Sequence, residues 1–153
     1  MSPTEEMMLQ PRQIEMPAEI LAEEALQGSS LAEKAPLATA DARLAVAFVA
    51  RRYPDKFPAS AVASHCGLSR FQFSRAFHAT FRITFREYLL RYRIRAACEA
   101  LTRHHDSVTA IAYAVGFHDG SYFARMFRRY IGMLPSQYAR WHDRPDRSTP
   151  NTP

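Results

Sequence analysis

The chain has 153 residues, of which 47% are hydrophobic and 23% charged, so it can bury a core and wholesale disorder is excluded. Its two cysteines, Cys66 and Cys98, lie inside apolar helical patterns without a C-x-x-C spacing, which indicates reduced thiols and neither a disulfide framework nor a metal site. The sequence has no apolar run of about 18 residues and no leader pattern, so we expect a cytoplasmic protein without a membrane span.

The net charge of +5 hides a division along the chain. Residues 1–40 carry seven glutamates against Arg12 and Lys34, a charge of −5, so the remaining residues carry +10. Lys56 is the only lysine among those later basic residues, and all the others are arginines. The planar guanidinium suits phosphate and guanine better than an ammonium group does. A basic domain of this size favours a polyanionic partner, of which nucleic acid is the commonest.

Residues 1–40 also differ from the rest in having four prolines and no aromatic residue. We expect an acidic, largely disordered N-terminal tail, in which residues 17–27 form at most a short helix. This tail is too short for a separate effector-binding domain. A second disordered tail is expected over residues 143–153, which leaves residues 41–142 as the folded domain.

From Asp41 onward, apolar residues recur at three- and four-residue spacing, which predicts helices. A first helix follows a candidate N-cap at Asp41, buries Leu44, Ala45, Phe48 and Val49, and ends near residue 53. Six more helices are predicted over residues 59–66, 70–80, 84–103, 108–115, 120–131 and 135–141. The candidate caps of three of them are Ser69, Ser107 and Asp119. No tract alternates with a period of two, so the predicted class is all-α with seven helices.

Two pairs of these helices have the pattern of a helix-turn-helix. That motif needs a short scaffold helix, a turn that contains glycine, and a second helix with one apolar and one polar face. Gly67 and Gly116 mark the two turns. Phenylalanines four residues apart bury one side of each second helix, and the first of each pair, Phe73 and Phe123, lie 50 residues apart. Such a repeat in one basic chain predicts a protein that grips two neighbouring stretches of DNA groove.

The exposed sides of the two second helices carry the candidate base contacts. We expect Arg75 and Arg125 to project into the major groove and to pair with guanine O6 and N7, each contact giving about 1–3 kcal/mol of discrimination. Phe71 is an extra aromatic residue on the first of these helices, and it either touches a thymine methyl group or a sugar or adds to the core. The other residues predicted on these two sides are Arg70, Ser74, His78, Ser121, Ala124, Arg128 and Arg129.

The long helix between the two pairs is rich in arginine, and its arginines are Arg86, Arg91, Arg93 and Arg95. They span nearly three turns and cannot share one face, although Arg86 and Arg93 lie on one side with Arg82 nearby. Two roles are open for them: phosphate contacts, which give strong salt dependence, or internal ion pairs with Glu87 or Glu99. The predicted phosphate contacts are Arg82, Arg86, Arg91, Arg93, Arg128 and Arg129.

These motifs together resemble the DNA-binding domain of the AraC/XylS family of bacterial transcription regulators, over about residues 44–138. The densest match comprises Ile111-Ala112, Val115-Gly116-Phe117, Ser121-Tyr122-Phe123, Arg125, Phe127, Gly132 and Pro135-Ser136-Gln137-Tyr138. The first unit matches through Gly67-Leu68-Ser69, Phe73-Ser74-Arg75 and Phe77. The resemblance implies a seven-helix domain with two helix-turn-helix units joined by one long helix. It also implies base reading by Phe71, Ser74, Arg75, Gly120, Ser121 and Arg125.

The resemblance implies a transcription regulator, and we expect an activator that binds one asymmetric site on double-stranded DNA as a monomer. It also implies RNA polymerase as a partner, and it places the protein at the nucleoid. Arg82 stands where the family commonly has glycine, which predicts a strained or rebuilt turn. Leu134 replaces threonine, which removes a helix cap worth about 1 kcal/mol. Because Gly120 has no side chain to offer a base, we expect specificity to lie mostly in the first unit.

Other classes of function are disfavoured by the sequence. An enzyme lacks support because no P-loop, G-x-G-x-x-G or H-E-x-x-H motif occurs, and His104-His105-Asp106 has the character of a surface loop. We therefore expect no catalytic residue, no cofactor and no metal. A helical protein-interaction module would have this fold with a neutral or acidic recognition face. The remaining alternative is a DNA-binding fragment of a larger effector-responsive regulator.

Overall fold

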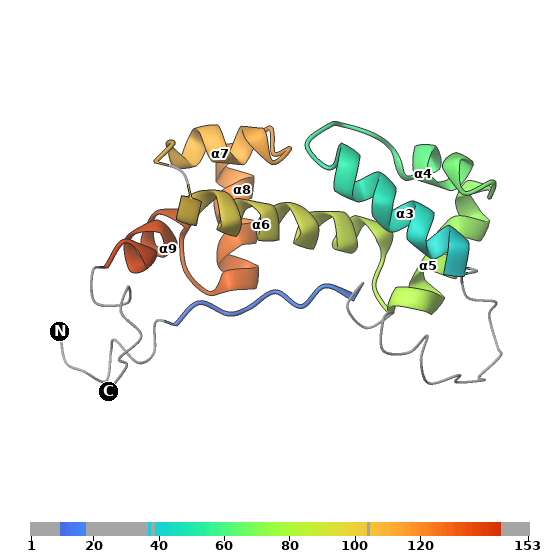
Figure 1. Ribbon diagram of the computed structural model, residues 1–153, viewed down its shortest axis with the longest axis horizontal. Helices are drawn as coiled ribbons and strands as arrows, with labels where there is room; N and C mark the ends of the chain where they lie inside the picture. Colours follow the sequence, from blue (N-terminus) through green and yellow to red (C-terminus); the bar gives the residue numbers. More distant parts are fainter. Residues whose placement is uncertain (1–9, 18–36, 38, 104, 145–153) are drawn as a thin grey trace. The chain divides into compact units, whose positions relative to one another are not determined.

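The computed structural model describes residues 10–17, 37, 39–103 and 105–144 of the chain. Over these ranges it contains seven helices and no strand (Figure 1), so the predicted all-α class is confirmed. The helices are α3 (Thr39–Arg52), α4 (Ala59–His65), α5 (Arg70–Phe81), α6 (Phe85–Arg103), α7 (Val108–Ala114), α8 (Gly120–Ile131) and α9 (Pro135–His142). The helix predicted over residues 17–27 lies, except for Pro17, outside the described residues, as does the tail beyond residue 144.

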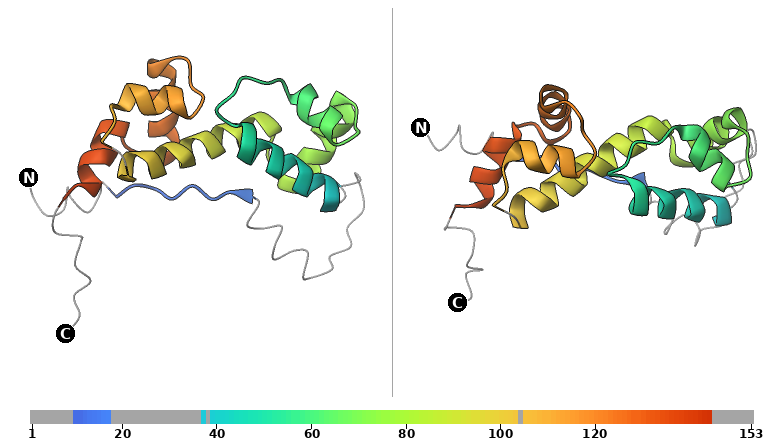
Figure 2. Two further views of the ribbon diagram at one scale, coloured as in Figure 1. Left: turned by 45° about the horizontal axis from the view of Figure 1, so that its top comes forward. Right: turned by 90° about the horizontal axis from the view of Figure 1, so that it is seen from above.

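The described residues form two compact units whose border lies inside α6, between Arg93 and Ile94. The N-terminal unit comprises the described residues from 15 to 93, and the C-terminal unit comprises residues 94–144 together with residues 10–14. Each unit contains one of the predicted helix pairs, α4 with α5 and α7 with α8, which Figure 2 shows from two further sides.

An aromatic cluster fills the N-terminal unit. Phe73 and Phe77 come from one side of α5, as their four-residue spacing predicts, and both are fully buried. The centroid of the Phe77 ring lies 4.3 Å from that of Phe81 and 5.4 Å from that of Phe85. Tyr88 of α6 packs against the same ring at 5.5 Å. Aromatic side chains bury much apolar surface, so this cluster supplies a large share of the unit's stability.

The first helix of the N-terminal unit begins earlier than the sequence predicts. α3 starts at Thr39, so Asp41 lies within the helix and the predicted N-cap at Asp41 is wrong. Leu44 was expected on the buried side but is 39% exposed, whereas Ala42 and Val49 are buried. With 3.6 residues per turn, a stripe through positions 42 and 49 leaves position 44 on the other side of the helix.

The C-terminal unit has a similar aromatic interior. Phe123 and Phe127 of α8 are buried with their ring centroids 5.7 Å apart, and Phe117 packs against Phe123 at 5.0 Å. Cys98 of α6 is half-buried beside Tyr138 of α9. Burial raises the pKa of the Cys98 thiol to about 12, so this thiol stays protonated at neutral pH and has little nucleophilic character.

Side-chain caps define where several helices begin. The predicted caps at Ser69, Ser107 and Asp119 are confirmed, and the hydroxyl of Ser107 accepts a hydrogen bond from Ala110 N at 3.1 Å. Leu134 provides no side-chain cap to α9, as its apolar side chain predicts. The Leu134 amide instead donates to Gln137 Oε1 at 2.9 Å.

Residues 10–17 form an extended segment (blue in Figures 1 and 2) that is held at several points. In the C-terminal unit, Arg12 N donates to the Ile131 carbonyl at 2.8 Å, and so pairs a carbonyl at the end of α8. In the N-terminal unit, Met16 is only 2% exposed, and Arg91 Nη1 donates to the Glu15 carbonyl at 3.4 Å. The tail predicted over residues 1–40 is largely outside the described residues, and these contacts concern residues 10–17 alone.

Candidate nucleic-acid interface

In the N-terminal unit, a tight turn joins α4 to α5. Gly67 has a φ of 69°, a left-handed conformation that glycine adopts without steric cost. The turn closes through Leu68 N, which donates to the Ala63 carbonyl at 2.9 Å. Ser69 then caps α5: its hydroxyl accepts from Gln72 N at 3.2 Å, and the Gln72 side chain accepts from Ser69 N at 3.0 Å. This reciprocal pair fixes the direction in which α5 leaves the turn.

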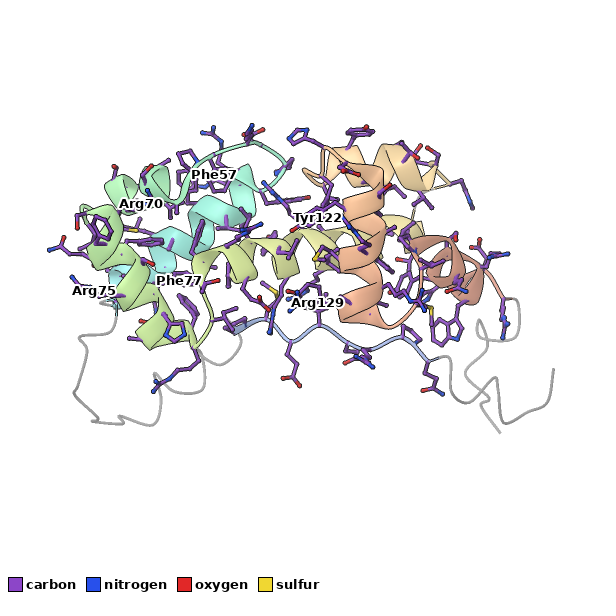
Figure 3. All side chains as sticks on the ribbon, turned by 180° about the vertical axis from the view of Figure 1, so that it is seen from behind. Phe57, Arg70, Arg75, Phe77, Tyr122 and Arg129 are labelled. Atoms are coloured by element: carbon purple, nitrogen blue, oxygen red, sulfur yellow. The ribbon has the colours of Figure 1, made fainter. Side chains whose placement is uncertain are left out.

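The outer side of α5 is basic and carries one large aromatic residue. Arg70, Ser74 and Arg75 are exposed, opposite the buried side that includes Phe77 (Figure 3). Phe71 is 76% exposed, so the alternative that it adds to the core is wrong. An exposed phenylalanine among arginines offers apolar contact to a base methyl group or a sugar. All four predicted base-contact residues of the first unit therefore lie on one accessible helix surface.

The C-terminal unit builds the same turn with one more residue. Phe117 N donates to the Ala112 carbonyl at 2.9 Å, 49 residues after the matching bond in the first turn. The buried phenylalanines of α5 and α8 are 50 residues apart, so His118 is the added residue. Gly116 has a φ of 101°, and Asp119 caps α8 by accepting from the two amides at positions 121 and 122, at 2.8 and 3.1 Å. A single carboxylate here meets the capping need that two side chains share in α5.

The outer side of α8 presents a row of arginines. The exposed predicted contacts on this helix are Gly120, Ser121, Arg125, Arg128 and Arg129, and Figure 3 labels Arg129. The Arg125 guanidinium carbon lies over the ring of Tyr122, 6.0 Å from its centroid, and the Tyr122 ring in turn lies 6.0 Å from that of Phe117. Tyr122 was named from the sequence only within the family match and was given no role in the site. Its three-residue spacing from Arg125, which places both side chains on one helix face, is the signal that could have found it.

The arginines of α6 divide between internal and external positions. Arg93 is half-buried, with Nε donating to the Tyr53 carbonyl at 2.7 Å and Nη2 donating to the Asp55 carbonyl at 2.8 Å. Burial lowers the pKa of Arg93. Arg91 pairs with Glu87 at 3.2 Å, and Arg95 approaches Glu99 at 4.0 Å, so the expected internal ion pairs are present.

These contacts revise the predicted phosphate set. Arg93 donates hydrogen bonds to two backbone carbonyls just after α3, so it has a structural role. Arg91 donates to the Glu87 carboxylate and to the Glu15 carbonyl. Sequence spacing did not reveal this because both partners of Arg93 lie about 40 residues earlier in the chain. Arg82 and Arg86 are exposed and remain available by position.

The described residues hold no cluster of three or more histidine, cysteine, aspartate or glutamate side chains that could bind a metal ion. His104, one of the residues of the predicted surface loop, lies outside the described residues, while His105 and Asp106 are exposed. Within the described part of the chain, none of the helices combines the length and apolar character needed to cross a membrane.

Two short scaffold helices, each joined through a tight glycine turn to a second helix with a basic outer side, define a double helix-turn-helix protein. A family model described as "Helix-turn-helix domain" matches residues 62–140. The chain belongs to this family, which is of the AraC/XylS type, and its members are DNA-binding transcription regulators and not enzymes.

Two relatives illustrate the similarity. The chain is 35% identical to the MmsAB operon regulatory protein of Pseudomonas aeruginosa over 77 residues. This match covers 50% of this chain and 25% of that protein. It is 30% identical over 118 residues to the HTH-type transcriptional activator RhaS of Escherichia coli, which covers 77% of this chain and 42% of that protein. The chain thus matches less than half the length of these relatives.

Solved structures show the same fold. The C-terminal domain of the two-component response regulator yesN from Fusobacterium nucleatum is 30% identical, with a TM-score of 0.63 over 66% of this chain and 99% of that domain. The DNA-binding domain of AdpA, solved in complex with a target DNA, is 22% identical, with a TM-score of 0.62 over 67% of this chain and 91% of that domain. The predicted family resemblance is confirmed.

Proposed function

We propose that this regulator binds one asymmetric DNA site as a monomer, with α5 and α8 inserted into adjacent segments of the major groove. The observation that carries the proposal is the matched exposure of Arg75 and Arg125 on corresponding sides of the two second helices, opposite buried phenylalanines. A guanidinium at such a position pairs in a bidentate manner with guanine O6 and N7. Two reading helices in one chain remove the need for a dimer.

The base-reading set follows from exposure and position on the two helices. On α5 it comprises Arg70, Phe71, Ser74 and Arg75. On α8 it comprises Gly120, Ser121 and Arg125, where Gly120 offers only backbone close to the base edges. The phosphate contacts are Arg82 at the end of α5, Arg86 on α6, and Arg128 and Arg129 on α8, all of which are exposed. Each such contact releases about one counterion, so binding weakens steeply as salt concentration rises.

The direction of control is proposed to be activation. RhaS is named a transcriptional activator, and an activator bound beside a promoter acts by contacting RNA polymerase, which we propose as the protein partner. The site of action is the bacterial nucleoid, in the cytoplasm. The function is the same whether the chain acts alone or as the DNA-binding part of a longer, effector-responsive regulator.

The test is selection of bound duplexes from a randomised DNA library by the purified chain, followed by affinity measurements over a range of salt concentrations. We expect one asymmetric consensus with two separated blocks of preferred bases. Arg75→Ala and Arg125→Ala should each relax the preference in a different block, at a cost of about 1–3 kcal/mol.

Arg86→Ala is the matched control. It removes an exposed arginine of α6 that is assigned to phosphate, so affinity should fall by the same factor on every sequence and the salt dependence should drop by about one contact. If Arg75→Ala and Arg125→Ala behave in the same uniform way, both arginines clamp the backbone and the base-reading assignment is wrong. If the chain selects no sequence and shows no salt-sensitive binding, the proposed function itself fails.

A further inference from the structure

Tyr122 links the core of the C-terminal unit to the arginine proposed to read bases on α8. Its ring is half-buried, lies 6.0 Å from the buried ring of Phe117, and has the guanidinium of Arg125 over it at 6.0 Å. Phe117 in turn packs against Phe123, 5.0 Å away. We infer that Tyr122 is a positioning residue that holds Arg125 ready for a base and so determines specificity through the arginine. This inference rests on the function proposed above.

The position of Tyr122 is fixed from two directions. Its amide donates to the Asp119 carboxylate at 3.1 Å, which anchors the backbone at the start of α8. Its ring is anchored by Phe117, which is only 4% exposed. A tyrosine has few rotatable bonds, so these two anchors leave the ring little freedom. The ring is therefore a rigid platform on an otherwise solvated helix side.

An arginine side chain gains more than most from such a platform. Its long side chain has many rotamers, and ordering it on DNA costs free energy that lowers affinity. Stacking on an aromatic ring engages the flat face of the guanidinium. The N–H donors lie in the plane of the group and stay directed outward, where a guanine edge accepts two of them. The platform thus orders Arg125 without using the donors that read the base.

Comparison with the first unit shows why α8, and not α5, has an aromatic ring beneath its arginine. Gln72 occupies the position in α5 that corresponds to Tyr122, three residues before Arg75. Its side chain is engaged in the capping box with Ser69. In α8 the Asp119 carboxylate accepts from two amides by itself, so the residue at position 122 is released from capping. The change of cap from serine to aspartate therefore permits the aromatic platform.

The experiment compares Tyr122→Gln, which installs the residue of the first unit, with Tyr122→Phe, which keeps the ring. Both full-length proteins are tested for affinity on the duplex selected by the unchanged chain, on that duplex with each base of the Arg125 block replaced, and on a scrambled duplex. We expect Tyr122→Gln to weaken binding to the selected duplex about 3- to 10-fold, with less than about 2-fold change on the scrambled duplex. Tyr122→Phe should stay within about 2-fold of the unchanged chain on all of them.

Two further proteins separate positioning from general damage. In an Arg125→Ala background, Tyr122→Gln should have no additional effect, because the platform has lost the group it positions. Tyr130→Gln is the matched control on the same helix. The ring of Tyr130 lies under the guanidinium of Arg129, with 5.7 Å between the guanidinium carbon and the ring centroid. Because Arg129 is assigned to phosphate, any loss of affinity should be equal on all duplexes. Circular dichroism and thermal unfolding verify that each variant is folded. Tyr122→Phe keeps the ring that contacts Phe117, so it is expected to fold even where Tyr122→Gln does not.

The inference is overturned if Tyr122→Gln binds the selected duplex like the unchanged chain, or if its effect adds in full to that of Arg125→Ala. It is also overturned if Tyr122→Phe is as damaging as Tyr122→Gln, because the hydroxyl group would then act directly on DNA. Failure of the proposed function gives a different result, in which the unchanged chain itself selects no duplex.

Discussion

Replacing Arg82 by glycine tests how the turn between α5 and α6 is built. Arg82 has a φ of 62°, and among the described residues it is the one non-glycine residue with positive φ. The C-terminal unit has Gly132 at the corresponding place, 50 residues later, with a φ of 87°. A left-handed conformation costs an L-residue roughly 1–2 kcal/mol. The sequence-based expectation of strain at this turn is therefore confirmed.

The expected effect is a difference between two contributions. Glycine relieves the roughly 1–2 kcal/mol of steric strain, and it adds about 0.5–1 kcal/mol of backbone entropy to the unfolded chain. Arg82→Gly should therefore raise the free energy of unfolding by about 0.7 kcal/mol, within a range of about 0–1.5 kcal/mol. In a unit of this size that change raises the melting temperature by a few degrees. Because Arg82 is also assigned to phosphate, the same protein should show lower DNA affinity and a salt dependence reduced by about one contact.

The assays are urea unfolding followed by circular dichroism and DNA binding across a salt series. Gly132→Ala is the mirror control: the added Cβ would meet Arg12 Nε at 3.6 Å, an ordinary contact. Its cost is therefore the strain of the positive φ less the backbone entropy that alanine removes from the unfolded chain, a destabilisation of about 0.7 kcal/mol within a range of about 0–1.5 kcal/mol. If Arg82→Gly lowers the free energy of unfolding, the arginine side chain stabilises the turn by more than its backbone strain, and the reasoning is refuted.

Three further predictions follow from buried contacts. Met16→Ala should reduce the free energy of unfolding by about 1.5–3 kcal/mol in urea titrations, because the Met16 side chain is 2% exposed. Gln13→Ala, at an exposed position of the same segment, should change it by less than about 0.5 kcal/mol. Equally small effects of the two substitutions would show that burial of Met16 does not stabilise the fold. Arg93→Met should lower the free energy of unfolding by about 2–3 kcal/mol, because two backbone carbonyls lose a charged donor. The salt dependence of DNA binding should stay unchanged in Arg93→Met and decrease in Arg86→Met. A decrease in Arg93→Met as well would return Arg93 to the phosphate set. Burial raises the pKa of Cys98 in the folded state to about 12 from an ordinary 9.0, so between these values the unfolded thiol loses its proton and the folded one keeps it. The free energy of unfolding should therefore fall as pH rises from 9 to about 12, and Cys98→Ala should make that fall less steep. The same pH profile in both proteins would contradict this prediction.

Local signals in the sequence were sufficient for most of the fold. Ser69, Ser107 and Asp119 are short polar residues ahead of apolar periodic runs, and each caps a helix because capping depends on neighbours within three residues. The paired phenylalanines gave the orientation of α5 and α8 for the same reason, since residues four apart share one face of a helix. Exposure of Arg75 and Arg125 followed directly from that orientation.

The features that were missed depend on contacts between distant parts of the chain. Arg93 has the same local pattern as Arg86, and only the carbonyls of Tyr53 and Asp55 distinguish their roles. The segment around Met16 is short and rich in proline and polar residues, so its composition predicted disorder. Hydrogen bonds join it to Arg91 and Ile131, which lie much later in the sequence. Periodicity carries no information about such partners.

α5 and α8 are alike in fold and unlike in how they present their side chains. α5 exposes four candidate readers, including Phe71 and Arg75, and uses Gln72 for capping. α8 begins with Gly120, which has no side chain, exposes Ser121, and has the Arg125 guanidinium over the ring of Tyr122. The two candidate side chains of α8, Ser121 and Arg125, reach fewer bases than the four neighbouring side chains of α5. The base preference is therefore expected to be broader beneath α5 and narrower, although sharp, beneath α8. A selected consensus with its longer block under α8 would contradict this division.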